Sequence, residues 1–165
     1  MLAIRPATEN DIPDILEIYN DAILNTTATF DTELKTQDEM QKWFRGHGPN
    51  HPVIVAIVKE QIAGWASLSR WSDKKAYDTT AECSFYVRKE MRQQGIGKRL
   101  LEMITLEGEK AGIYCILSRI TEGNEASIHL HDAFGYRNIG IMKKAGKKFG
   151  KFLDVHLMQK VFPAS

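Results

Sequence analysis

The sequence predicts a mixed α/β fold of the α+β type, in one domain that spans residues 1–165. Three observations predict it. Runs of β-branched and apolar residues, typical of strands, are interspersed with amphipathic stretches that repeat at helical spacing. Two helix-like stretches come early and three strand-like segments follow them, which is not the order of a regular βαβ repeat. A length of 165 residues also suits one hydrophobic core.

The first half of the chain is expected to hold two helices among four strands. The first helix follows a cap at Thr8 or Asn10 and carries Pro13 in its first turn, where a missing N–H does no harm. A capping box of Thr36 and Glu39 begins the second helix. The strands are expected at residues 2–5, 53–58, 62–69 and 79–87.

The second half is expected to hold two helices and three strands. A helix over residues 95–112 closes at Gly112, and a strand over residues 113–121 follows it. The next helix begins at Asn124 or Glu125 and closes at Gly135. Residues 136–144 and 151–160 are expected to form a terminal pair of strands around residues 146–150.

Composition excludes several classes of protein. The formal net charge is +1, so no electrostatic argument favours a nucleic acid or a membrane surface as a partner. No apolar run approaches the ~20 residues of a membrane helix, and the first residues lack the pattern of a signal peptide. Cys83 and Cys115 belong to no metal-binding spacing, and no histidine forms one. We therefore expect a cytoplasmic protein with reduced thiols and no metal.

A glycine-containing turn between a predicted strand and a predicted helix reads Arg92-Gln93-Gln94-Gly95-Ile96-Gly97-Lys98. Glycines remove the Cβ atoms that would block an approach to the backbone. The first N–H groups of the following helix have no partner within that helix, so a pyrophosphate fits there. The spacing matches neither a GxxxxGKS/T loop nor a GxGxxG turn. A solvated strand-to-helix connection with a basic face is the alternative.

This turn resembles the acetyl-CoA motif of the Gcn5-related N-acetyltransferase (GNAT) superfamily, although Gln94 stands where the family pattern has glycine. The segment from Asn124 to Ser127, with Gly135-Tyr136 after it, is similar to the second half of that family's pattern. The resemblance implies acetyl-CoA as co-substrate, with its pyrophosphate on the amides of the turn. It also implies a twisted, mostly antiparallel sheet, splayed at the strand beside acetyl-CoA and flanked by about four helices.

Longer segments in the same order resemble one group of that superfamily, the phosphinothricin and methionine sulfoximine acetyltransferases. The segments are residues 18–27, 76–78, 82–87, 127–136 and 148–154. The resemblance implies an N-acetyltransferase of the EC 2.3.1 class that acetylates the α-amino group of phosphinothricin, methionine sulfoximine, methionine sulfone or a similar acceptor. Transfer is expected to be direct, in a ternary complex, because no cysteine has a base partner for an acyl-enzyme.

Two residues are candidates for proton transfer. Glu82 lies in a strand whose other residues are mostly apolar or small, where a carboxylate is unusual unless it has a function. It also matches the family's glutamate. The resemblance makes it the base, directly or through water. His131 matches the family position of the acid for the departing thiolate, and an imidazole with a pKa of ~6.5 can give or take a proton. An edge-strand glutamate and a helix-surface histidine, both in solvent, are the alternatives.

The resemblance also assigns binding residues on the two sides of the reaction. For acetyl-CoA they are Phe85, Tyr86, Val87, Arg92, Gln93, Gln94, Gly95, Ile96, Gly97, Lys98, Asn124 and Ser127. For the acceptor they are Tyr19, Thr27, Phe30, Arg70, Lys74, Tyr77 and Lys148. A main-chain amide near residues 85–87 is expected to stabilise the oxyanion. Solvent exposure is the alternative for Lys74, because the sequence around it departs from relatives that carry arginines there.

Other functions stay open from the sequence alone. A GNAT enzyme could acetylate a polyamine, an aminoglycoside or a protein N-terminus, or the chain could be a non-catalytic acetyl-CoA-binding module. The net basic charge of residues 70–75 argues against a polyamine acceptor, and the presence of both Glu82 and His131 argues against a non-catalytic module. The resemblance is compatible with a homodimer.

Overall fold

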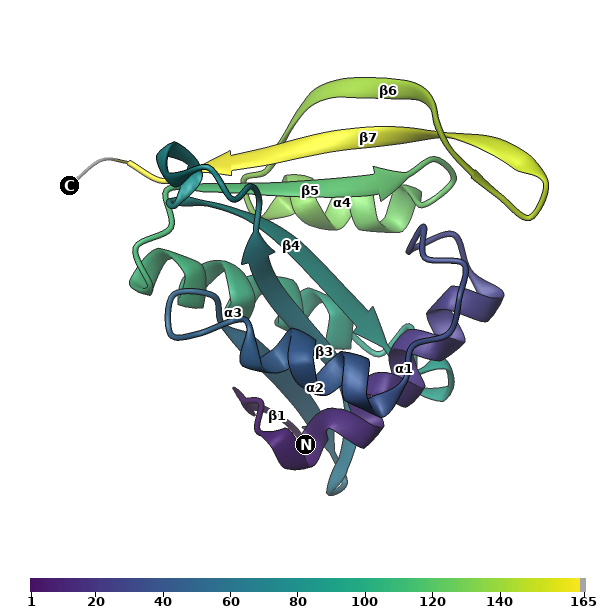
Figure 1. Cartoon of the computed structure of the whole chain (residues 1–165), viewed down its shortest axis with the longest axis vertical. Helices are drawn as coiled ribbons and strands as arrows, with labels where there is room; N and C mark the ends of the chain where they lie inside the picture. The colour runs from purple at the N-terminus through teal and green to yellow at the C-terminus, as the bar shows by residue number, and fades with distance from the viewer. Residues whose placement is uncertain (164–165) are drawn as a thin grey trace.

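The computed structural model describes residues 1–163, and its centre is one seven-stranded sheet in the order β1-β2-β3-β4-β5-β7-β6 (Figure 1). The strands are β1 (Leu2–Pro6), β2 (Val53–Val58), β3 (Gln61–Arg70), β4 (Thr80–Val87), β5 (Cys115–Thr121), β6 (Arg137–Lys148) and β7 (Lys151–Val161). The α-helices are α1 (Ile12–Asn25), α2 (Gln37–Arg45), α3 (Ile96–Lys110) and α4 (Glu125–Ala133). Short 3-10 helices span Glu9–Asp11, Lys75–Tyr77 and Lys89–Met91. Within this part of the chain no helix has both the length and the apolar character needed to cross a membrane.

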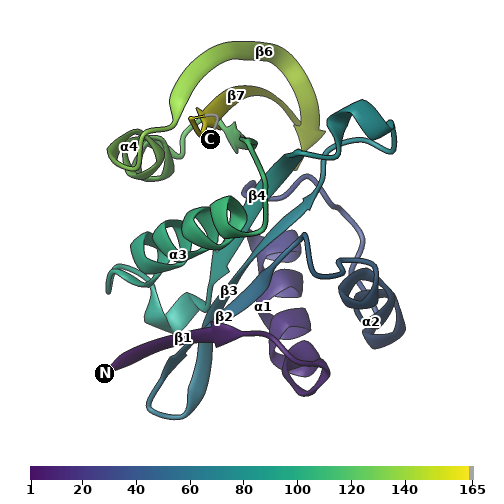
Figure 2. The same ribbon diagram turned by 90° about the vertical axis from the view of Figure 1, so that its left-hand side faces the viewer.

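Helices cover both faces of the sheet, and two hydrophobic clusters lie between them and the strands. Figure 2 shows α3 on one face of β2, β3 and β4, and α1 and α2 on the other. The larger cluster packs Leu100 and Ile104 of α3 against Leu68 and Ile116 of the sheet. The smaller one packs α1 and α2 around Trp65. The mixed sheet with four α-helices confirms the predicted fold class.

Most local signals at the helix ends act as the sequence indicated, but Thr8 begins the 3-10 helix Glu9–Asp11, and Asp11 is the residue before α1. The Thr36 hydroxyl accepts from the Glu39 amide at 3.2 Å and begins α2. Pro13 lies in the first turn of α1. Gly112 and Gly135 follow α3 and α4 with φ values of 88° and 85°, which favour glycine. These caps set where each helix stops, and therefore where each following strand enters the sheet.

The pairing of β4 with β5 creates the opening on which the site depends. β4 is antiparallel to β3 along its length, but it pairs in parallel with β5 only from Thr80 to Glu82. Beyond Glu82, β4 has no strand partner on its β5 side, whereas β5 continues alongside β7. This divergence matches the splayed sheet that the resemblance implied, and it leaves backbone N–H and C=O groups of residues 83–87 available to a ligand.

The terminal hairpin differs from the expectation at its turn. β6 was expected to end near residue 144, but it continues to Lys148. A bulge between Met142 and Gly146, with Lys144 at φ 51°, shifts the register, and the Lys144 amide donates to Asp154 at 2.8 Å. The glycine and lysines that signalled a turn therefore form a bulge within a longer strand.

Candidate active site

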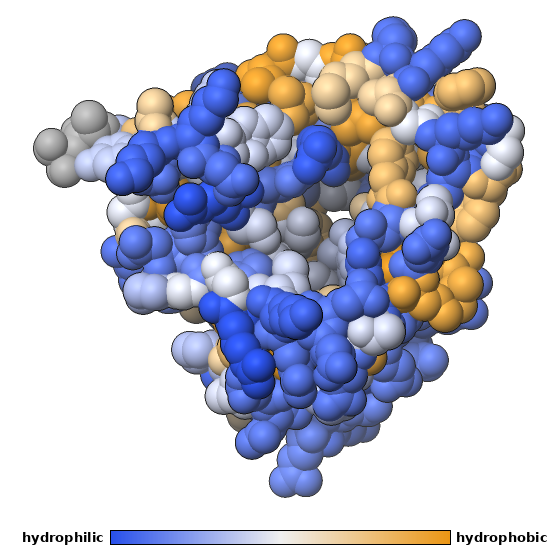
Figure 3. Space-filling model, in the orientation of Figure 1, coloured by the Kyte–Doolittle hydropathy of each residue, from blue (hydrophilic) through white to orange (hydrophobic). Residues whose placement is uncertain are grey.

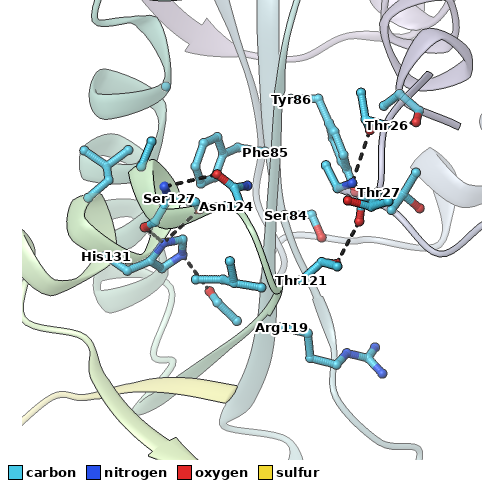
Figure 4. A pocket seen from close by; sticks show the side chains of 18 of the residues that line it. Thr26, Thr27, Ser84, Phe85, Tyr86, Arg119, Thr121, Asn124, Ser127 and His131 are labelled. Atoms are coloured by element: carbon cyan, nitrogen blue, oxygen red, sulfur yellow. Dashed lines mark hydrogen bonds between the residues drawn. The ribbon is translucent and has the colours of Figure 1, made fainter. Parts of the chain in front are cut away.

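A cavity of about 1240 Å³ follows the gap between the diverging ends of β4 and β5 (Figure 3 shows the hollow between the β6–β7 end and the helices α1 and α2). Its lining comes mainly from α1 and the loop after it, from β4 and the turn before α3, and from β5 and α4, with a few residues of β6 and β7. Figure 4 shows two sides of this site: His131, Ser127, Asn124 and Phe85 lie on one side of β4, and Ser84, Thr121 and Arg119 lie on the other. Segments far apart in the chain thus face a common slot.

The turn before α3 has the features of an anion site. Gly95 adopts φ 80° and ψ 6° as the residue before α3, and no side chain caps that helix. The first N–H groups of α3 are therefore free to bind an anion at the positive end of the helix dipole. A Cβ on Gly97 would lie 3.3 Å from the Phe85 ring, so glycine allows the helix to approach β4 closely. Lys98 lines the cavity at this end.

Asn124 and His131 belong to the other helix at the slot. The Asn124 side chain caps α4 by accepting from the Ser127 amide at 3.2 Å. His131 is 2% exposed, and its Nδ1 lies 2.7 Å from the Ser127 carbonyl oxygen. Since a carbonyl can only accept, Nδ1 carries the proton. The neutral ring then has Nε2 as an acceptor, for the hydroxyl of Ser118 at 3.0 Å.

Burial lowers the pKa of His131, because desolvation penalises the charged imidazolium, although its hydrogen bond to Ser127 partly opposes this. The ring is enclosed by Phe85 and Tyr136, whose ring centroids lie 5.9 Å and 4.9 Å away. The sequence predicted an ordinary imidazole pKa for His131, because a sequence does not show that this side chain is buried. In the fold His131 is a neutral side chain that reaches the cavity together with Ser118.

Glu82 is the last residue of β4 that pairs with β5. Its carboxylate is bound to a cation of the neighbouring strand. Arg119 of β5 donates from Nε to Oε2 at 2.5 Å and from Nη2 to Oε1 at 2.6 Å. The Glu82 side chain is 20% exposed and that of Arg119 is 53% exposed. The guanidinium carbon also lies 5.6 Å from the centre of the Trp71 ring. Glu82 and Arg119 therefore form a bidentate ion pair at the edge of the slot.

A second cavity, of about 290 Å³, opens on the same face of the sheet as Glu82. Ser84 lies two residues beyond Glu82 and so on the same face of β4, and it lines both cavities, as Tyr86 does. Aromatic and hydroxyl side chains line the remainder, including Trp43, Trp65, Ser67 and Ser69. The two cavities share Tyr19, Asp31, Ser84 and Tyr86 in their linings, and the second is large enough for a small polar molecule.

Comparison with known proteins identifies the family. A family model described as an acetyltransferase (GNAT) domain matches residues 4–157. The chain belongs to the GNAT acetyltransferase family. It is 36% identical over 159 residues to an L-methionine sulfoximine/L-methionine sulfone acetyltransferase from Pseudomonas paraeruginosa, covering 95% of this chain and 92% of that protein.

Two solved structures of acetyltransferases overlap almost the whole fold. A phosphinothricin acetyltransferase from Sinorhizobium meliloti in complex with acetyl-CoA has a TM-score of 0.93 at 32% identity, over 97% of this chain and 88% of that one. A ribosomal-protein-alanine N-acetyltransferase from Brucella melitensis has a TM-score of 0.94 at 35% identity, over 97% of this chain and 99% of that one. This GNAT protein is an N-acetyltransferase that uses acetyl-CoA as its co-substrate.

The slot fits the acetyl-CoA that a GNAT enzyme uses. The uncapped start of α3 presents N–H donors for a pyrophosphate, and β4 presents unpaired backbone groups beside it. Of the residues predicted for acetyl-CoA, all line the cavity except Gln94. Arg92 lines it but also donates to the Val87 carbonyl at 3.2 Å and pairs with Asp21.

The residues predicted for the acceptor divide into two sets. Tyr19, Thr27 and Phe30 line the main cavity. Arg70, Lys74, Tyr77 and Lys148 line neither cavity. The contacts of Lys148 are with the backbone: its ammonium donates to the carbonyls of Thr26 and Thr29, at 2.7 and 2.8 Å. Lys148 therefore ties the loop after α1 to β6 and has its proton donors directed at the backbone.

Several polar residues of the cavity were missed by sequence reasoning, among them Arg119, Ser118 and Asp31. Arg119 and Ser118 lie in a largely apolar strand, and their partners Glu82 and His131, 37 and 13 residues away, belong to other elements. Asp31 accepts from the Tyr19 hydroxyl and follows a stretch that carries no helix or strand signal. The alternation of residues within β5 could have placed Arg119 on one face of the strand, but only the sheet order places that face beside Glu82.

Proposed function

We propose that this enzyme transfers the acetyl group of acetyl-CoA to the α-amino group of a small amino-acid-like acceptor, of the class of methionine sulfoximine, methionine sulfone or phosphinothricin. The observation that carries this proposal is the position of Glu82 where β4 and β5 part, on the face that carries the small polar cavity. The names of similar proteins, methionine sulfoximine and phosphinothricin acetyltransferases, support the acceptor class.

Acetyl-CoA enters from the α3 and α4 side and supplies an acetyl group activated as a thioester. The amides of residues 95–98 bind its pyrophosphate, with Arg92 and Lys98 as nearby cations. Backbone groups of Phe85, Tyr86 and Val87 that lack a β5 partner bind the pantetheine arm and the carbonyl oxygen. Asn124 and Ser127 complete the donor side from α4.

The acceptor enters from the opposite face, where Glu82 takes a proton from its ammonium group, directly or through a water molecule. Tyr19, Thr27 and Phe30 border this side, and the second cavity holds the acceptor's own side chain. The amine and the thioester thus meet across β4 from opposite sides, a geometry that favours direct transfer.

His131 acts on the donor side through the hydroxyl of Ser118. Its neutral ring accepts from that hydroxyl, which lines the slot, so His131 positions the Ser118 hydroxyl where the sulfur departs. To act as the acid it takes up a proton from solvent at Nε2 and then donates that proton to the Ser118 oxygen, while the Ser118 hydroxyl proton goes to the thiolate. An acyl-enzyme on Cys83 is disfavoured, because burial raises the pKa of that thiol to about 12.

The whole chain, residues 1–165, acts as one acetyltransferase domain in the cytoplasm, as a homodimer. Exposed apolar side chains on the β6–β7 hairpin support the dimer (Figure 3 shows apolar colour gathered over that end). The near-neutral net charge of +1 supports small-molecule acceptors over nucleic acids or membranes as partners.

The experiment is an acceptor panel with acetyl-CoA, scored by release of the free thiol. The panel contains methionine sulfone, methionine sulfoximine, phosphinothricin, a polyamine, an aminoglycoside and an alanine-terminated peptide. We expect the three amino-acid-like acceptors to give the highest kcat/KM. A preference for the peptide would instead favour an activity like that for which the Brucella melitensis protein is named. Thiol release with none of the six would contradict the proposed acceptor class.

A further inference from the structure

Arg119 is the cation closest to the proposed base, and the function proposed so far does not use it. Three cations line the main cavity among the described residues: Arg92, Lys98 and Arg119. The first two lie at the turn before α3, whereas Arg119 is bound to Glu82 on the acceptor face. An acceptor bound at Glu82 therefore has one cavity-lining cation beside its amine.

We propose that Arg119 binds the α-carboxylate of the acceptor and thereby makes the enzyme specific for amino acids. The inference rests on the proposed function, an acetyltransferase of α-amino acids. In such an acceptor the ammonium and the carboxylate are attached to one carbon, so a carboxylate must lie beside any ammonium that reaches Glu82. Arg119 presents a planar guanidinium, which binds carboxylates in a two-pronged geometry.

Binding is an exchange of ion pairs in which charge balances. Without acceptor, both oxygens of Glu82 accept from Arg119. The acceptor's carboxylate takes the guanidinium, and its ammonium takes Glu82, so one internal ion pair becomes two pairs to the ligand. Arg119 is suited to this movement because its side chain is 53% exposed and its guanidinium lies over the Trp71 ring, which can hold the cation while it turns.

The exchange explains how a site with an occupied base can be selective. An amine without an acid group would have to separate Glu82 from Arg119 and leave the guanidinium without a carboxylate. An amino acid replaces the lost interaction with its own carboxylate. The acid group of the acceptor therefore releases the base, and the discrimination is made at the carboxylate although the reaction takes place at the amine.

The test compares one amino acid with its α-carboxamide, which has the same side chain and amine but no negative charge. Methionine sulfone and methionine sulfone amide form such a pair. The kcat/KM ratio of acid to amide is measured for the wild type, for Arg119→Gln, for Arg119→Lys and for Arg137→Gln, an exposed control on β6. Comparing this ratio between proteins at one pH cancels the different amine pKa values of the two acceptors.

We expect Arg119→Gln to lower kcat/KM for the acid roughly 10- to 100-fold, as loss of a charge-assisted hydrogen bond does. The kcat/KM for the amide should be equal to the wild-type value or higher. Arg119→Lys should restore part of the ratio, and Arg137→Gln should leave it unchanged. An equal loss for both acceptors would show that Arg119 only holds Glu82 in place, and no loss would show that it is dispensable. Either result overturns this inference and leaves the proposed function intact.

A wild-type enzyme that acetylates neither member of the pair but acetylates other amines would contradict the proposed function itself. Coenzyme A affinity, measured by the shift in melting temperature, serves as the check on folding. It should be the same in all four proteins, because Arg119 lies on the acceptor face of β4.

Discussion

At the scale of single residues, the molecule places its two candidate proton-transfer groups in opposite environments. Glu82 is a partly exposed carboxylate held by a guanidinium, and His131 is a buried, neutral imidazole. Glu82 shares a face of β4 with Ser84, whereas His131 packs against Phe85, which belongs to the other face (Figure 4). This separation suits a reaction in which one proton leaves the amine and another reaches the sulfur.

Replacing Glu82 with glutamine tests the base. The amide keeps the shape of the side chain but cannot take a proton from the acceptor, so kcat/KM should fall about 10²- to 10⁴-fold, the usual contribution of a general base. Coenzyme A affinity should stay the same. Glu109→Gln, on the exposed side of α3, is the matched control and should leave both quantities unchanged. Full activity in Glu82→Gln would remove this residue from the mechanism.

The buried histidines predict how stability depends on pH. Burial lowers the pKa of His131 and of His47 in the fold, while both titrate near ~6.5 in the unfolded chain. Their stabilising effect is therefore complete above pH ~6.5 and is lost as the pH falls through the lower folded values. The free energy of unfolding in urea should drop between pH 7.5 and pH 5.5.

The variant His131→Gln should reduce that pH dependence, and the exposed His129→Gln should leave it as in the wild type. The slope against pH is the informative quantity, because the His131 variant also loses hydrogen bonds and is less stable at every pH. An unchanged slope would mean that His131 is protonated as readily in the fold as in the unfolded chain.

The sequence indicated Glu82 and His131 but not the residues that bind them. Each drew attention because it broke an apolar pattern or matched a family position. Arg119 was missed because its role depends on the parallel pairing of β4 and β5, and Ser118 because its role depends on the packing of α4 against β5; no local pattern encodes either. The contacts of Lys148 could not be predicted either, since its partners are carbonyls more than a hundred residues earlier in the chain.

At the scale of elements, the start of α3 and the divergence of β4 from β5 together make the donor site. Two glycines of similar backbone geometry mark the two ends of α3: Gly95 at φ 80° and Gly112 at φ 88°, neither with any atom near where a Cβ would lie. An alanine at either place is strained by ~1–2 kcal/mol in this left-handed region. Comparing alanine variants of these two glycines therefore distinguishes the effect of backbone strain on stability from an effect on ligand binding.

Gly95→Ala and Gly112→Ala should each lower the free energy of unfolding by about 1 kcal/mol. Only Gly95→Ala should weaken coenzyme A binding, because only that strain shifts the amides that face the cavity. Calorimetric titration with coenzyme A and urea unfolding measure the two effects. Equal affinity in both variants would contradict the assignment of this turn to the pyrophosphate.

The helices and strands were easier to predict than their arrangement relative to one another. Capping residues, glycines after helices and β-branched runs are local, and the sequence located every α-helix and strand from them, to within a few residues. The bulge in β6 was not found, because a glycine and several lysines between strands are equally typical of a turn. The order of the strands was not found either, since it depends on packing between distant segments.

At the scale of the whole molecule, the β6–β7 hairpin leaves large apolar side chains uncovered. Phe149 and Phe152 are 63% and 56% exposed, and Ile139 and Ile141 are 50% and 46% exposed. Patches of this kind mark interfaces between proteins. A second copy of the chain is the partner that we propose for this surface.

The charge substitutions Ile141→Glu and Phe152→Glu should make the protein monomeric, because a carboxylate buried in an interface without a partner is costly. Light scattering after size exclusion gives the mass. Leu106→Glu on α3, whose leucine is 44% exposed, is the control and should keep the dimer. A wild-type protein that is monomeric at all concentrations would contradict the proposal.

The place of β7 between β5 and β6 has a consequence for how the chain is made. Both neighbours of β7 leave the ribosome before it does, so for that interval each has an edge of unpaired backbone groups. A premature stop after Gly150 would therefore remove an interior strand and leave two adhesive edges, one on either side of the gap. Such fragments would be prone to aggregate during translation, and chaperones and proteases would act on them before they could form a folded enzyme.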